Sequence, residues 1–153
     1  MNGALDLAQH VQILCASYLH FTGREIVPPG NAQDSLADRL ENASFALLSH
    51  GTQADPIFNY GNKIALELFE MDWKEFTSLP SRLSAEPINQ SERAHLLEEV
   101  SKHGFIDNYS GTRISKSGRR FMILNATVWN LFDAQDRYYG QAALIRDWED
   151  IPT

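Results

Sequence analysis

The chain has 153 residues, of which 43% are hydrophobic and 22% are charged, and its formal net charge is −7. This composition excludes a wholly disordered chain, and the length fits one globular domain of ordinary size. The acidic balance argues against binding to nucleic acid or anionic lipid, and the single cysteine, Cys15, excludes an internal disulfide or a cysteine-rich metal site. Because we find neither a signal peptide nor a run of about 18 apolar residues, we expect a cytoplasmic protein that does not bind membranes.

The first part of the chain predicts two helices. Apolar residues recur at three- and four-residue steps over about residues 3–20, which is typical of an amphipathic helix. Gly23 ends this helix, and a Pro-Pro-Gly linker leads to a short second helix that Asp34 or Ser35 can cap. We interpret Cys15 as a small buried hydrophobic residue of the first helix. Residues 1–43 are therefore expected to form an N-terminal helical extension.

The remaining residues, 44–153, predict an α/β (α+β) domain. The expected segments are strands at 45–50 and 57–60, helices capped by Asn62 and Asp72, a loop at 81–87, a helix from Ser91 or Glu92 to His103 with Ala94, Leu97 and Val100 on one face, and strands at 105–115, 119–132 and 137–148. The last three strands follow one another through short turns, which predicts an antiparallel meander. We expect a five-stranded antiparallel sheet with short helices over one face.

The predicted strand at residues 119–132 is apolar on both of its faces. One alternate set contains Phe121, Ile123 and Trp129, and the other contains Leu124 and Val128. An antiparallel sheet with one face in water shows polar residues in one of the two sets, so both faces of this sheet must be covered. The middle helices can cover only one face. The other face needs the N-terminal helix, a second subunit, or both.

This order of elements resembles a PAS domain, a small sensory and interaction module. The resemblance is carried by the stretch Asp55-Pro56-Ile57-Phe58-Asn59-Tyr60-Gly61-Asn62 before a helix, by Gly118-Arg119-Arg120-Phe121, and by the final run from Gly140 to Asp147. Within that superfamily the chain is most similar to the MEKHLA family over about residues 45–148, and most distinctively over Gly104–Ile114. Members of that family occur as stand-alone bacterial proteins and at the C-terminus of plant homeodomain–leucine zipper factors.

The resemblance implies a sensory or regulatory domain, without enzymatic activity, that binds a small molecule or mediates protein–protein interaction, including homodimerisation. The partner would bind through the N-terminal helix and the outer sheet face. The homeodomain and the zipper are absent from this sequence and the charge is acidic, so we expect no DNA binding. The PAS alignment turns one side of residues 109–113 and one side of residues 121–129 toward a central cavity. The candidate ligand-binding residues are Tyr60, Trp73, Arg82, Tyr109, Arg113, Ile123, Asn125 and Trp129. In a purely structural reading, Arg113 pairs with an acid and the aromatic side chains fill the core.

The sequence disfavours flavin and haem as cofactors. In light-sensing PAS relatives a reactive cysteine stands at the position of Ser81, and three amide side chains stand at the positions of Arg113, Ile123 and Ile145. Haem-binding relatives use a histidine on the helix before the sheet, where this chain has His95 and His103, each beside acidic residues or a helix end. Ser49 and His50 are adjacent in a strand, so their side chains point to opposite faces and cannot form a catalytic dyad.

Two other readings stay open at this stage. One is a cone-shaped isomerase or hydrolase similar to the nuclear transport factor 2 superfamily, with His103, Asp107 and Tyr109 as acid–base candidates. That fold places its meander after one early strand, whereas a PAS domain has two strands before its helices. The other reading is a dimerisation module with a filled core.

Overall fold

The structure is a computed structural model that describes residues 6–28 and 35–152. Helix α1 spans Leu7–Thr22 and is capped by Asp6, whose side chain accepts a hydrogen bond from the Gln9 amide. Helix α2 spans Leu36–Glu41 and is capped by Ser35, one of the two predicted caps. Both predicted helices are thus confirmed, while Asp34, residues 3–5 and part of the linker lie outside the described residues.

Six strands form one antiparallel sheet in the order β2-β1-β5-β4-β3, with β6 also paired to β4. Their bounds are β1 Ala46–His50, β2 Phe58–Gly61, β3 Phe105–Ile114, β4 Arg120–Phe132, β5 Tyr138–Ile145 and β6 Asp147–Asp150. The predicted strand at 137–148 is interrupted at Arg146, and its two parts pair with successive stretches of β4. This break turns the five predicted strands into six without changing their order.

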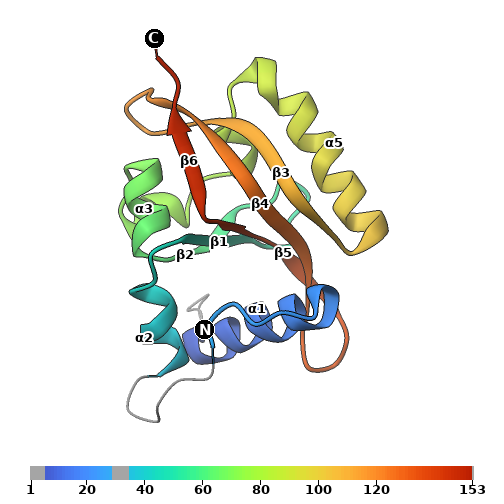
Figure 1. Cartoon of the computed structure of the whole chain (residues 1–153). Helices are drawn as coiled ribbons and strands as arrows, with labels where there is room; N and C mark the ends of the chain where they lie inside the picture. Colours follow the sequence, from blue (N-terminus) through green and yellow to red (C-terminus); the bar gives the residue numbers. More distant parts are fainter. Residues whose placement is uncertain (1–5, 29–34, 153) are drawn as a thin grey trace.

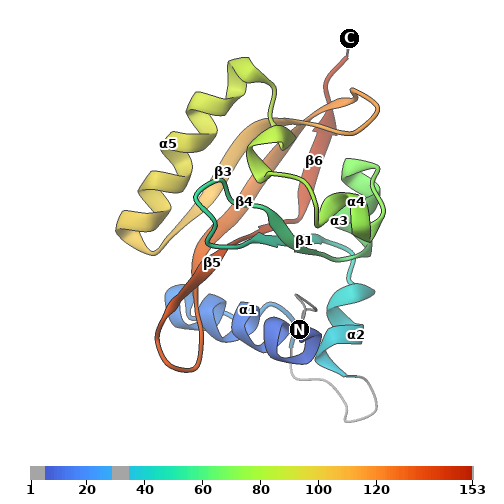
Figure 2. The ribbon, with the colours of Figure 1, turned by 180° about the vertical axis from the view of Figure 1, so that it is seen from behind.

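The two early strands, β1 and β2, precede the helices of the domain. Their position agrees with the PAS arrangement, and the alternative of a cone-shaped fold with one early strand is wrong. Helices α3 (Lys63–Phe69), α4 (Trp73–Phe76) and α5 (Pro87–His103) pack on one side of the sheet, which we call the inner face. Figures 1 and 2 show α5 along β3 and β4, and α3 near β1 and β2.

Helix α5 differs from its prediction in two ways. It begins at Pro87 rather than at Ser91, because the fixed backbone angle of proline suits the first position of a helix. It buries Arg93, Leu96 and Val100, so the buried face is rotated from the predicted one and Ala94 is exposed. The predicted loop before α5 contains a short 3-10 turn over Ser81–Ser84.

Helix α1 covers the opposite, outer face of the sheet (Figure 1). The apolar character of β4 on both faces predicted that this face is covered, and the N-terminal helix was one of the expected covers. Leu14 and Tyr18 of α1 are at most 2% exposed and belong to one core cluster with Trp129 and Leu131 of β4. The ring centroids of Tyr18 and Trp129 lie 4.8 Å apart in an edge-on arrangement. Cys15 is partly buried beside this cluster, and burial raises the pKa of its thiol to about 11. The predicted boundary at residue 43 between extension and domain stays a prediction.

Two asparagines in the left-handed region change which side chains face each side of the sheet. Asn108 of β3 has φ 57° and Asn125 of β4 has φ 52°, and the pairing of the two strands shifts nearby. Such a bulge inserts one residue into a strand and reverses the alternation beyond it. Phe121 and Ile123 therefore face the inner core, whereas Trp129 and Leu131 face α1.

A buried polar network attaches α1 to β1. His10 is fully buried, its Nε2 lies 2.9 Å from Ser49 Oγ and its Nδ1 lies 3.0 Å from the hydroxyl of Tyr139. Ser49 Oγ donates its proton to Asn59 Oδ1 at 2.6 Å, so it accepts from Nε2 of His10. In this tautomer His10 is a donor to Ser49 and not a base that could activate it.

This network predicts a loss of stability in mild acid. Burial lowers the pKa of His10 to about 4, and burial also lowers the pKa of His50. The unfolded chain takes up protons below a pKa of about 6.5 while the folded chain does not, so stability is full above that pH and falls toward pH 4. Urea unfolding between pH 7.5 and 5 measures this slope. The slope of the unfolding free energy against pH gives the number of protons that the chain takes up on unfolding, and in His10→Gln this number should fall by about one. An unchanged slope would contradict the conclusion that His10 is buried in its neutral form.

Candidate functional site

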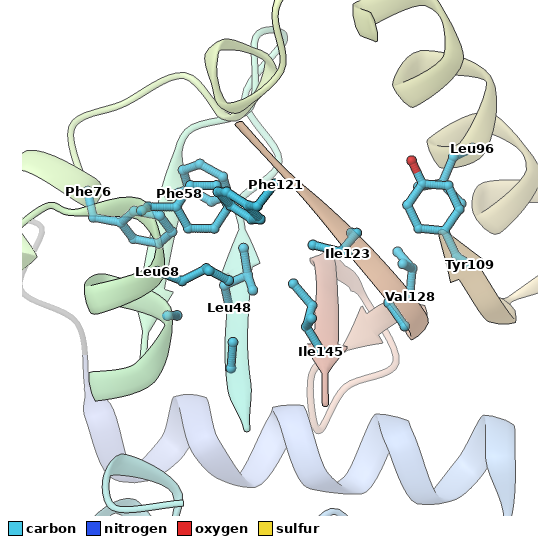
Figure 3. Packing of buried hydrophobic residues seen from close by; sticks show 14 of the residues in the cluster. Leu48, Phe58, Leu68, Phe76, Leu96, Tyr109, Phe121, Ile123, Val128 and Ile145 are labelled. Atoms are coloured by element: carbon cyan, nitrogen blue, oxygen red, sulfur yellow. The ribbon is translucent and has the colours of Figure 1, made fainter. Parts of the chain in front are cut away.

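A cavity of about 50 Å³ lies between α5, the turn before it and the inner face of the sheet. Its apolar lining is Leu48, Phe58, Phe69, Leu96, Leu97, Ile123, Val128, Ala142, Ala143 and Ile145, and its polar lining is Ser49, His50, Ser84, Arg93, Tyr109, Arg113 and Gln141. Figure 3 shows Tyr109 and Leu96 near α5, with Ile123, Val128 and Ile145 further along the sheet. A largely apolar cavity with several converging polar groups is the usual form of a small-molecule site.

Arg93 enters the cavity from the buried face of α5. It is 9% exposed, and its Nη2 donates a hydrogen bond of 2.9 Å to Ser81 Oγ. Burial, and secondarily the charge of Arg113, lower the pKa of Arg93 to about 10, which leaves it charged at neutral pH. Asp55 and Glu92 act in the opposite direction without forming an ion pair with Arg93. Arg93 and Arg113 line the same cavity.

Arg113 approaches the cavity from β3. It is 6% exposed and donates from Nη1 to the carbonyl of Thr112 at 2.8 Å and from Nη2 to the hydroxyl of Tyr109 at 3.1 Å. Tyr109 in turn donates 2.8 Å to Glu92 at the surface of α5, and burial raises its pKa. Glu92 therefore reaches Arg113 only through Tyr109.

His50 is the third polar side chain of this group. It is 6% exposed, and its Nδ1 lies 3.0 Å from the carbonyl of Gly51. Its Nε2 is buried and has no hydrogen-bond partner among the described residues. Burial is the main reason that its pKa is lowered, with a further contribution from the charge of Arg93, whereas the Gly51 carbonyl and the Gln141 side chain act in the opposite direction. The Gln141 side chain lies close enough to raise the pKa of His50, but it forms no hydrogen bond with Nε2.

Of the eight predicted ligand-binding residues, Tyr109, Arg113 and Ile123 line the cavity. Their contact with a ligand stays a prediction. Asn125 and Trp129 do not line it, because the bulge reverses the alternation of β4 at Asn125. Asn125 is exposed, and Trp129 is fully buried under α1 on the other face of the sheet.

The other three predicted residues also lie elsewhere. Tyr60 is buried on the outer face, 5.5 Å from the ring of His10 and 6.0 Å from that of Trp73. Trp73 is 41% exposed on α4, since the short helix turns this side chain toward the surface. Arg82 points into solvent from the turn before α5 and pairs with Asp55 at 3.1 Å.

Sequence reasoning missed Arg93, His50 and Gln141. Arg93 had a signal, because it precedes Leu96 and Val100 by three and seven residues and so shares their helix face. His50 had a weaker signal, since alternation along β1 points its side chain to the face of the sheet opposite to that of Ser49. The acid–base candidates of the enzyme reading are not brought together: Asp107 pairs with Arg24 at 2.9 Å, and His103 is exposed beside Glu99.

The cavity residues do not fit a flavin or a haem. Ligands of that size occupy sites of roughly 300–1,000 Å³, whereas this cavity measures about 50 Å³. Ile123 and Ile145 line it without any hydrogen-bonding group, and Ser81 is held by Arg93. His95 and His103 are exposed on α5 and do not line the cavity. Within the described part of the chain, no three His, Cys, Asp or Glu residues are grouped to hold a metal ion.

No described helix combines the length and the apolar character needed to cross a membrane.

Three solved structures are similar in fold. The PAS domain of a protein from Colwellia psychrerythraea matches with a TM-score of 0.63 and 15% identity, over 72% of this chain and 92% of that chain. An RNA-binding light-oxygen-voltage receptor matches with a TM-score of 0.62 and 15% identity, over 80% of this chain and 36% of that chain. The light-state dimer of the fungal blue-light photoreceptor Vivid matches with a TM-score of 0.60 and 14% identity, over 96% of this chain and 97% of that chain. These likenesses establish a PAS-like fold.

Among curated proteins, the chain is similar to the homeobox-leucine zipper protein ATHB-9 of Arabidopsis thaliana, with 25% identity over 149 residues. The match covers 92% of this chain and 17% of that protein, so the chain spans about a sixth of its relative. A family model of the MEKHLA domain matches residues 8–150. This match begins in α1 rather than at residue 45, so the predicted extent of the resemblance was too short. With nearly all of its length inside the match, the chain belongs to the MEKHLA domain family.

Proposed function

We propose that this chain is a non-enzymatic, PAS-like sensory domain that binds a small molecule in the cavity and transmits its presence to α1. The observation that carries the proposal is the position of β1, a fully buried strand that contributes to both sides of the sheet. His50 lines the cavity on the inner face, and the adjacent Ser49 bonds His10 of α1 on the outer face. A ligand that moves His50 would therefore shift the Ser49–His10 contact.

The output of such a sensor would be an altered surface on the outer face of the sheet. Leu7 and Leu19 of α1 are 43% and 46% exposed, and Met122 and Leu124 of β4 are only partly buried beyond the end of α1. In Figure 1 no helix lies over the β3, β4 and β6 part of this face. We propose that a protein partner or a second copy binds here, since a partly exposed apolar surface next to a movable helix favours regulated association. Light scattering at rising protein concentration tests for the homodimer.

Filling the cavity tests the coupling to α1. Ala143 lines the cavity between Leu48 and Val128, and Ala143→Leu adds a side chain of about the size of the empty space. We expect hydrogen–deuterium exchange of α1 amides to change by about threefold or more, because stability is redistributed along the packed elements. Ala94→Leu on the exposed side of α5 is the matched control and should leave α1 unchanged. Changes confined to α5 and the inner face would contradict the proposal.

A further inference from the structure

We propose that the ligand of this cavity is a small carboxylate with a short apolar body, whose carboxylate group is bound between Arg93 and Arg113. This inference rests on the proposed ligand-binding function and assigns a chemical class to the ligand. It follows from the charge balance of the cavity, from the unused hydrogen-bond donors in it, and from its size.

The charge balance is the first argument. The other arginines that form ion pairs do so at the surface: Arg24 with Asp107, Arg82 with Asp55, Arg119 with Asp150, Arg120 with Glu86, and Arg137 with Asp133. Arg93 and Arg113 are far more buried, yet neither pairs directly with a carboxylate of the described residues. A buried charge is costly unless an opposite charge compensates it, so two buried guanidinium groups in the lining of one cavity favour an anion.

The unused donors are the second argument. A guanidinium carries five N–H donors, and those of Arg93 make one side-chain hydrogen bond, to Ser81, while those of Arg113 make two. Nε2 of His50 is not one of these donors: Nδ1 of that ring donates to the carbonyl of Gly51, so Nε2 of the neutral ring is a buried acceptor, with no partner among the described residues. The two guanidinium groups are buried, line the cavity from α5 and β3, and offer N–H donors in the planar arrangement that binds both oxygens of a carboxylate.

Size and polarity limit the rest of the ligand. The cavity measures about 50 Å³, and beyond the polar group its walls are Leu96, Ile123, Val128 and Ile145. Such walls suit a short hydrocarbon or a small ring. A phosphate has further charged oxygens that these apolar walls would leave without partners, so we assign a carboxylate.

Titration of the full chain with sodium acetate, butyrate and benzoate tests the assignment, with sodium chloride at equal ionic strength and neutral butyramide as comparisons. We expect a saturable rise in the melting temperature and saturable shifts in amide NMR spectra with butyrate or benzoate, and neither with chloride. Arg93→Gln and Arg113→Gln should each weaken this binding by about tenfold or more. Arg137→Gln, at an exposed ion pair far from the cavity, should leave the affinity within about twofold of the original.

The melting temperature without added carboxylate separates a binding role from a structural one. If Arg93 is present to bind an anion, Arg93→Gln removes a buried charge that has no direct ion-pair partner and raises the melting temperature of the free protein. A lowered melting temperature together with unchanged butyrate affinity would assign Arg93 to structure alone and overturn the inference. So would an absence of saturable carboxylate binding, or tighter binding of inorganic phosphate.

These outcomes are distinct from failure of the proposed function. Saturable binding of butyramide but not of butyrate, abolished by Ala143→Leu, would overturn the anion assignment and leave a small-molecule sensor. Saturable butyrate binding that leaves hydrogen exchange of α1 unchanged would support the carboxylate site and contradict the coupling to α1.

Discussion

Replacement of Asn62 by alanine is expected to lower the free energy of unfolding by about 4 kcal/mol. Asn62 is fully buried and caps α3. Its Oδ1 accepts hydrogen bonds from the amides of Leu47 at 3.0 Å and Ala65 at 3.1 Å, and its Nδ2 donates to the carbonyls of Leu40 and Phe45, each at 2.9 Å. The side chain thus joins α2, β1 and α3, and its loss removes four hydrogen bonds to backbone groups in the interior.

Urea unfolding followed by circular dichroism measures this loss. The matched control is Asn42→Ala, which removes an exposed amide with one bond of 2.9 Å to the carbonyl of Asp38. We expect that control to change stability by less than about 1 kcal/mol. If the two variants unfold at the same urea concentration, the four bonds of Asn62 do not stabilise the domain as we infer.

Asn62 also illustrates what the sequence could predict. Local signals, such as a capping side chain before an apolar helix, are contained in a few neighbouring residues, and Asn62, Asp72 and Gly104 end or begin helices as expected. The strand order followed from apolar runs separated by turns together with the PAS resemblance. The need for a cover on the second face of β4 followed from its alternation, and α1 provides that cover.

The site was harder to predict because its geometry depends on non-local features. The left-handed conformation at Asn125 is set by the pairing of β3 with β4, and nothing in the neighbouring residues distinguishes that asparagine from one in a regular strand. Two predicted ligand residues therefore lie outside the cavity. The grouping of His50, Arg93 and Arg113 joins β1, α5 and β3, and only the packing of α5 on the sheet brings the three together.

The second substitution that we expect to have a large effect lies at the contact of α1 with the sheet. Leu14 is 0% exposed and packs in the cluster that contains Leu47, Trp129 and Leu144. Leu14→Asp places a carboxyl group in this apolar layer, which costs about 4 kcal/mol or more, since the lost packing adds to the burial of a polar group. The rearrangement with the lowest free-energy cost is detachment of α1 from the sheet. We expect Leu14→Asp to bind a hydrophobic dye and to associate, with an increased mass in light scattering, because the outer face is then exposed.

Leu19→Asp is the control that separates detachment from a general effect of aspartate in this helix. Leu19 lies on the same helix but is 46% exposed, so its replacement keeps the core cluster intact and should leave mass and dye binding unchanged. A monomeric, stable Leu14→Asp variant would show that the outer face tolerates the loss of its cover, and the doubly apolar strand β4 would then need another explanation. Association of Leu14→Asp alone would establish that α1 is the element whose displacement exposes an interaction surface, as a sensor that signals through this face requires.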